Sequence, residues 1–280
     1  MTVSSNLSCK SKGMYAMRLQ MTAIIKKDLQ RIVSSKRMFI CLLVVPLVLT
    51  IIMPTIFLLT TCFVPEKSTE LDKLLELLPI TEQSTNFLEN MAGLILNYAL
   101  PIFFLIIPIM SSTIMSATSF VGEKEKQTLE TLLYCPLSLT QIFQAKVAAS
   151  FLLSMLVSCI SFSVMLIVLE TEIYVTAGLF ILPGIQWLLV MLLLAPALSL
   201  IAVTLIVRIS AKAQSVEDAQ QGAVFLLLPI LLMLISQFSG LFLISAWMLL
   251  GLGVVCAVFA GFLLKRAMGR FTYESLHASF

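Results

Sequence analysis

Segment 122–146 contains the residues whose types and spacing suit specific chemistry, and that chemistry is the binding of another protein. Leu129, Leu132 and Leu133 are three and four residues apart, so they share one face of a predicted helix. Glutamate and lysine residues surround this face. A leucine anchor inside a charged rim is typical of a docking surface, because the leucines supply buried area and the charges set register and association rate. The alternative interpretation is a solvated helix beside the membrane with ordinary charges.

The same segment contains a predicted break between two helices. Pro136 ends the first helix, because proline cannot continue the hydrogen-bond pattern. Ser138 and Gln141 then stand three residues apart as a capping box, which predicts a second helix that runs through Lys146 into the membrane.

The sequence lacks the usual motifs for nucleotide binding and for catalysis. Neither GxxxxGK followed by Ser or Thr, nor GxGxxG, occurs in the chain. His277 is the single histidine, and the six cysteines show no CxxC spacing. We therefore expect no catalytic residues, no metal site and no cofactor bound by this chain.

The composition identifies the elements that must position this segment as membrane helices. Hydrophobic residues make up 59% of the 280 positions and charged residues 12%, against about 25% charged in soluble domains. We predict an all-α integral membrane protein, with an N-terminal part at 1–37, a six-span domain at 38–264 and a C-terminal tail at 265–280. The predicted spans are 38–64, 91–117, 147–169, 185–207, 222–240 and 241–264.

The charges between the spans predict the orientation of the chain. Sixteen of the 18 lysines and arginines lie in 1–37, 118–146, 208–221 and 265–280, whereas 65–90 holds six acids and two lysines. By the positive-inside rule both termini are cytoplasmic, and we expect a plasma-membrane location. The net charge of +3 thus reflects topology and indicates no nucleic-acid partner.

No predicted span contains Asp, Glu, Lys, Arg or His. Proton-driven pumps and carriers use such residues within the membrane, so their absence argues against that class and suggests that energy enters through another protein. A sodium-coupled carrier that binds its ion through backbone carbonyls stays open.

Several flanking segments have helical patterns. An amphipathic helix is predicted over 14–33, either as an interfacial collar or as a basic stub that orients the first span. A short external helix at 69–78 either shields the bundle or gates an exit, and shielding is favoured. Pro183 and Gly184 are expected to separate a dipping segment at 175–182 from the fourth span, and a tight outer turn is expected at 237–240.

Small and weakly polar residues recur at helical spacing within the spans. We interpret these ridges as close helix packing in preference to a substrate path. The ridges are Ser150, Ser154, Ser158 and Ser161 in the third span, Ser112 and Ser116 in the second, and Gly253, Ala257 and Gly261 in the sixth. The candidates for pathway lining are Asn97, Ser112, Ser116, Ser154, Ser158 and Gln186.

Segment 122–146 resembles the cytosolic loop between the second and third spans of ABC-2 type ABC transporter permeases. That loop runs approximately E-x-E-x-G-T-L-E-x-L-L-x-x-P-L-S and then reaches a lysine. The matching residues are Glu123, Glu125, Thr128, Leu129, Glu130, Leu132, Leu133, Pro136, Leu137, Ser138 and Lys146. Six predicted spans, a preceding amphipathic helix and a short basic tail extend the likeness over most of the chain, and 211–221 looks like the second cytosolic loop of the family.

This resemblance implies a type V exporter-like fold and the permease subunit of an ATP-driven exporter. The loop would carry a coupling helix that docks in a separate ATP-binding subunit, where ATP and Mg are expected. A second permease copy or a sister permease, together with membrane lipid, completes the implied partners. The implied docking residues are Glu123, Glu125, Thr128, Leu129, Glu130, Leu132, Leu133, Pro136 and Ser138.

The chain departs from the family pattern at Gln127 and Ala145, where glycines are usual, and its external loop has only 26 residues. These differences concern the subfamily. An ion-gradient-driven secondary carrier and a non-transporting sensor or immunity subunit remain as alternative functions. Uncharged spans favour an amphipathic or hydrophobic cargo, although sodium export also occurs in families of this kind.

Overall fold

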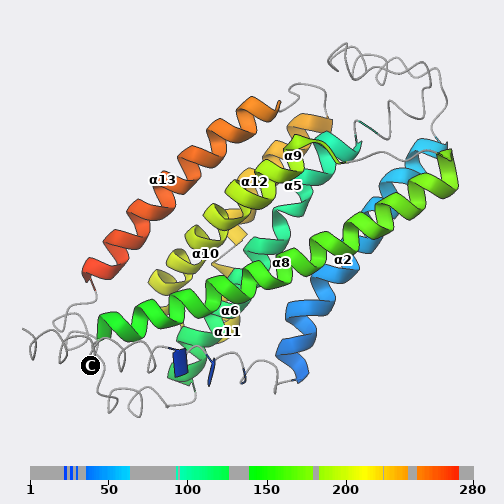
Figure 1. Ribbon diagram of the computed structural model, residues 1–280. Coiled ribbons are helices and arrows are strands. Elements are labelled where there is room, and N and C mark those ends of the chain that lie inside the picture. Colours follow the sequence, from blue (N-terminus) through cyan, green and yellow to red (C-terminus); the bar gives the residue numbers. More distant parts are fainter. Residues whose placement is uncertain are drawn as a thin grey trace, which may run out of the picture.

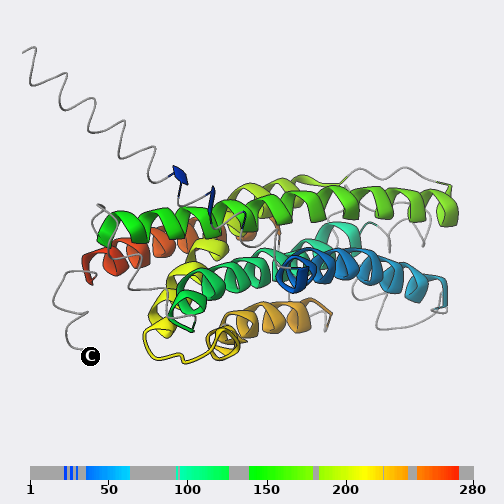
Figure 2. The ribbon, with the colours of Figure 1, turned by 90° about the horizontal axis from the view of Figure 1, so that it is seen from below.

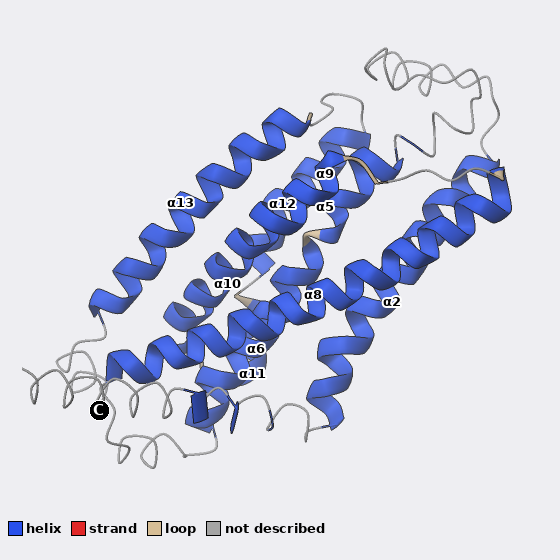
Figure 3. Cartoon of the chain, in the orientation of Figure 1, coloured by secondary structure: helices blue, strands red, loops and turns tan. Residues whose placement is uncertain are grey.

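The described residues are mostly helical, with short turns between helices, and no strand occurs among them (Figure 3). The structure is a computed structural model, and it describes residues 36–63, 93, 95–125, 139–178, 183–222, 224–238 and 245–270, with a few helical positions between 22 and 30. The predicted all-α fold is therefore confirmed.

Long apolar helices run up and down the molecule (Figure 1). They are α2 (Lys36–Phe63), η2 (Ile95–Ala99), α5 (Leu100–Phe104), α6 (Ile106–Glu125), α8 (Leu139–Ala177), α9 (Ile185–Leu189), η3 (Val190–Leu194), α10 (Ala195–Ser210), α11 (Val216–Gln221), α12 (Val224–Phe238) and α13 (Ala246–Arg270). Five stretches of the described residues are long and apolar enough to cross a membrane, and α2 adds a 28-residue apolar helix.

Helices α6 and α10 form the centre of the bundle. Helix α8 lies against one side of α6 and α12 lies on the other (Figure 2), while α2 packs on α8 and α13 packs on α10. In the most apolar part of Ile95–Glu125, 83% of the residues are buried, whereas the corresponding share in Ala246–Met268 is 22%. A bilayer therefore contacts mainly the peripheral helices, and the second span is enclosed by protein.

Prolines interrupt the second and fourth spans. The second begins as the π-helix η2, continues as α5 behind Pro101, and breaks at Leu105 before α6. Leu105 lies three residues before Pro108, whose ring and missing N–H disturb the preceding turn. The fourth span begins as α9 and continues as the π-helix η3, which is followed directly by α10 with Pro196 in its first turn. The regular α-helical pattern of the second span is thus interrupted at Leu105, although the span continues from Ile95 to Glu125.

Helix α8 is longer than its predicted span of 147–169 and extends from Leu139 to Ala177. Glu170 and Glu172 were expected in an external loop, but both lie in this helix. Val175 also belongs to α8, so the dipping segment predicted from that residue is wrong at its start. The helix ends at Gly178, whose φ of 65° is a conformation that suits glycine at a helix C-terminus.

Helix α12 continues to Phe238 and α13 begins at Ala246, so the connection between them is not the tight turn expected at 237–240. The predicted break at Pro183 and Gly184 is confirmed, because α9 begins at the following residue, Ile185.

Several predicted segments fall outside the described residues. They are most of the amphipathic helix at 14–33, the external helix at 69–78, and segment 126–138 with its leucine face. Of the first, Thr22, Ala23, Lys26, Lys27 and Gln30 are helical and exposed.

Candidate docking and coupling site

Segment 126–138 leaves and re-enters the bundle at the same end, because α6 ends at Glu125 and α8 begins at Leu139. We call this end, which also holds α11, the Glu123 end; the opposite end, where α9 and α13 begin, is the Gly184 end (Figure 1). The segment therefore connects α6 and α8, which we call its two stems.

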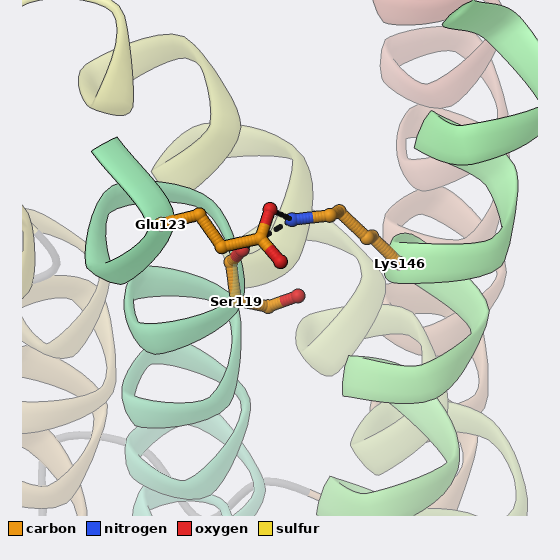
Figure 4. Close-up of polar contacts among 3 residues, drawn as sticks. All are labelled: Ser119, Glu123 and Lys146. Atoms are coloured by element: carbon orange, nitrogen blue, oxygen red, sulfur yellow. Dashed lines mark hydrogen bonds and ion pairs between the residues drawn. The ribbon is translucent and has the colours of Figure 1, made fainter. Parts of the chain in front are cut away.

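A buried ion pair joins the two stems. The Lys146 ammonium group contacts the Glu123 carboxylate and also donates a hydrogen bond to the backbone carbonyl of Ser119 (Figure 4). The side chains of Lys146 and Glu123 are only 4% and 2% exposed. Each group thus depends on the other, because a single buried charge without its partner would have lost its hydration without compensation.

Aromatic rings cover this ion pair. The Lys146 ammonium lies 5.3 Å from the centre of the Phe120 ring, a cation–π distance, and the Phe120 and Phe143 ring centres are 5.8 Å apart. Phe143 comes from the first turns of α8 and Phe120 from the last turns of α6. Hydrophobic packing and charge pairing therefore act at the same place between the two helices.

The residue after Glu123 connects α6 to a different neighbour. Lys124 donates to the backbone carbonyls of Ala213, at 3.2 Å, and Ala211, at 3.4 Å. These carbonyls follow the last turn of α10, where the helix dipole is negative and a lysine is favourable. The end of α6 is therefore bound both to α8 and to the loop after α10.

Helix α11 packs against this same end of α6. Its Ser215 N-cap accepts a hydrogen bond from the Asp218 backbone N–H at 3.1 Å, and Ala219 is fully buried. Ala219 packs in a small core with Ala117 and Val121 of α6. The region 211–221 is thus a structured part of the Glu123 end.

The structure describes only two of the residues proposed for docking, Glu123 and Glu125. Glu123 faces inward as part of the ion pair, and Glu125 is exposed in the last turn of α6. Helix α8 begins directly after Ser138, where the capping box predicts its start. The others lie outside the described residues, and their docking role stays a prediction: Thr128, Leu129, Glu130, Leu132, Leu133, Pro136 and Ser138.

At the Gly184 end, polar groups join the beginnings of the second and fourth spans. The Asn97 amide oxygen accepts a hydrogen bond from the Gly184 backbone N–H at 2.8 Å, and the Trp187 indole N–H donates to the Leu96 carbonyl at 2.9 Å. Gln186 is 6% exposed beside them. Asn97 and Gln186 thus lie together near the beginnings of η2 and α9. The Asn97 amide oxygen is already bound to the Gly184 backbone N–H.

The serines proposed as pathway lining are all fully buried. Ser112 and Ser116 of α6, and Ser154 and Ser158 of α8, donate to carbonyls within their own helices. Side chains satisfied in this way demand no water or substrate, and their small size permits close helix contact. Their lining role remains a prediction, and the geometry favours packing.

The glycine ridge predicted in the sixth span is only partly correct. Gly253 is buried, and a Cβ atom there would lie 2.7 Å from Leu193 Cγ. Ala257 and Gly261 are exposed, and a Cβ at Gly261 would meet nothing within 4 Å. Since α13 is peripheral, only one narrow stripe of it contacts protein.

One further polar contact lies in the membrane-spanning helices. The Thr55 hydroxyl of α2 donates to the Glu172 carboxylate of α8. Glu172 lies outside the predicted third span at 147–169 but inside the observed helix α8. The membrane helices are therefore not as free of charged residues as the sequence suggested. Among the described residues, no group of three or more His, Cys, Asp or Glu side chains is placed to hold a metal ion.

Sequence reasoning missed the partnership between Glu123 and Lys146 and the link made by Lys124. The available signal was the presence of opposite charges in the last turn before the predicted loop and in the first turns after it. Helices that follow one another in sequence are usually adjacent in space, so opposite charges at their ends are candidates for pairing.

Comparison with known protein families agrees with these features. The profile described as ABC-2 family transporter protein matches residues 22–248. The chain belongs to this family. It is thus a multi-pass membrane protein and an ABC transporter permease in the general sense, as the resemblance of segment 122–146 indicated. No curated protein and no solved structure matches the chain.

Proposed function

We propose that this ABC-2 family chain is the permease subunit of an ATP-driven exporter, and that segment 126–138 docks a separate ATP-binding subunit. The observation that carries the proposal is the fixing of both stems of this segment at one end of the bundle, by the Glu123–Lys146 pair and by α11. A segment held in this way can pass a force from a partner to the membrane helices.

Sequence chemistry supports the division of labour. The chain has no phosphate-binding loop, and ATP with Mg is therefore assigned to the partner. The positive-inside rule supports placing the Glu123 end and both termini in the cytoplasm, where such a partner would lie. Family resemblance supports a second permease copy or a sister permease and a plasma-membrane location.

The test replaces the leucine face of the segment. Leu129→Glu, Leu132→Glu and Leu133→Glu together remove the apolar anchor and place charges where burial is required. We expect the variant chain to reach the membrane but to lose the ATP-binding subunit during affinity purification of the complex. The measurement is the amount of ATP-binding subunit recovered per permease, together with ATP turnover in the purified sample.

The matched control adds the same charges to the opposite face of the same predicted helix. Gln127→Glu, Thr131→Glu and Tyr134→Glu lie on the face of this predicted helix that is opposite the leucines, because successive residues are rotated by about 100°. The control should keep the partner. Normal recovery of the partner with the leucine variant would contradict the docking role, and transport by the permease alone under an ion gradient would indicate the carrier alternative.

A further inference from the structure

The Glu123–Lys146 pair lies at the place where a displacement of segment 126–138 first reaches the bundle. It connects α6 two residues before its end with α8 in its second turn. The part of the chain between Glu123 and Lys146, which includes segment 126–138, is therefore closed at its base by this pair. The pair is therefore the ion-pair contact between α6 and α8 that lies nearest to the loop, in addition to the apolar packing farther along the two helices.

Burial makes this contact resistant to separation. Both side chains are almost fully buried, and the Lys146 ammonium group also donates to the Ser119 carbonyl (Figure 4). The Phe120 ring is a further neighbour of this ammonium group. To separate the stems, the two charges would have to part inside an apolar layer before water reached them, which is unfavourable. An apolar contact at the same place would allow the helices to slide more easily, because hydrophobic contacts do not depend on the relative direction of particular groups.

The neighbouring residue extends the same body to a third helix. Lys124 holds the carbonyls of Ala211 and Ala213 after α10, and α11 packs on the same turns of α6. Glu123 and Lys124 are adjacent in sequence, but Glu123 binds to α8 and Lys124 binds to the loop after α10. The end of α6 thus lies between α8 and the α10–α11 loop.

We propose that Glu123 and Lys146 are positioning residues, and that their pair locks the stems of segment 126–138 so that α6 and α8 respond to the partner as one rigid body. The inference rests on the proposed function for its consequence in transport, but the lock itself is a property of this chain alone. Glu123 then acts inside the permease, and the exposed docking face is left to the residues of the segment.

The first experiment measures the lock without any partner. Spin labels are attached at Glu125→Cys and Gln144→Cys, two exposed positions on the stems, in a chain whose own cysteines are replaced, and the full chain is reconstituted in liposomes. With Glu123→Gln, we expect the width of the distance distribution to about double, because the charge that holds the ammonium group is removed. An unchanged distribution would overturn the proposal.

The second experiment restores the lock by a tether. Glu123→Cys and Lys146→Cys, purified in the reduced state with the ATP-binding subunit, are joined by a short bis-maleimide linker. Before the linker is added, we expect the amount of cargo transported per ATP hydrolysed to be about tenfold lower than in the unaltered chain, a factor typical of coupling between two sites. After the linker joins the two cysteines, this ratio should recover. Because the same sample is compared before and after, a general folding defect cannot imitate this rescue.

Lys265→Gln is the control, since Lys265 is an exposed lysine near the end of α13, and it should leave both readouts as in the unaltered chain. If the tether restores a narrow distance distribution but not the coupling ratio, the positioning role is overturned. If the unaltered chain has no ATP-binding partner at all, the proposed function fails, whereas the distance measurement still decides whether the lock exists.

Discussion

Replacement of Trp187 by Phe tests the contact that joins the second and fourth spans. Trp187 is 2% exposed, its indole N–H donates to the Leu96 carbonyl, and its ring lies 5.9 Å from that of Phe104 and 5.5 Å from that of Phe162. Phenylalanine keeps an aromatic ring but removes the donor. The Leu96 carbonyl is then buried without this partner, and the smaller ring leaves a gap.

The magnitude follows from these two effects. An unsatisfied buried carbonyl costs about 1–3 kcal/mol, and the incompletely filled space adds about 1 kcal/mol, so we expect a loss of roughly 2–4 kcal/mol in the free energy of unfolding. The second tryptophan of the chain supplies a matched control. Trp247 is 82% exposed on α13, so Trp247→Phe should change stability by less than about 0.5 kcal/mol.

The assay is equilibrium unfolding in mixed micelles, in which an increasing fraction of denaturing detergent unfolds the helices. Helix content is followed by circular dichroism, so that the same signal reports on both variants. Equal midpoints for Trp187→Phe and Trp247→Phe would refute the reasoning, because the buried indole would then contribute no more than one on the periphery.

Three further substitutions test other contacts with the same assay. Gly253→Leu should destabilise the protein by about 1–3 kcal/mol, because its side chain overlaps the facing leucine of η3, whereas Gly261→Leu should be near neutral. Gly184→Ala should cost about 1–3 kcal/mol, because a Cβ atom there would lie 2.8 Å from the asparagine amide oxygen that accepts its N–H. Lys146→Met should cost about 3–5 kcal/mol, and the added change Glu123→Leu should recover most of that loss; a double variant as unstable as the single one would contradict the assigned pairing.

Hydropathy predicted which segments form the bundle, but it placed the helix ends incorrectly. A window of apolar residues stops at the first charges, so the third span was expected at 147–169. In the structure α8 includes Lys146, as the capping box at Ser138 predicted, but it also continues past Glu172, which was not predicted. Both charges have a partner on a neighbouring helix. Pairing between distant segments is tertiary information, and a single sequence contains it only as unassigned charges.

Small residues illustrate a second limit. Both the serine stripe of the third span and the Gly253 ridge of the sixth have spacings of three or four residues, and both were interpreted as packing surfaces. The four serines of the stripe are buried, but the ridge turns away from protein after Gly253. Spacing identifies a face of a helix, whereas the number of helices that surround it depends on its place in the bundle.

The π-helices explain why Asn97 could not be placed from periodicity. The sequence did not predict the π-helices η2 and η3, which directly precede α5 in the second span and α10 in the fourth. A π-turn contains one residue more than an α-turn, so the direction of later side chains shifts by about 100°. If the α-helical period is extended from Ser112 back to Asn97, it therefore predicts the wrong direction for the Asn97 side chain. Because the turn rotates Asn97 to the start of the fourth span, its amide oxygen binds Gly184 and holds the two interrupted helices together at the end opposite the Glu123–Lys146 pair.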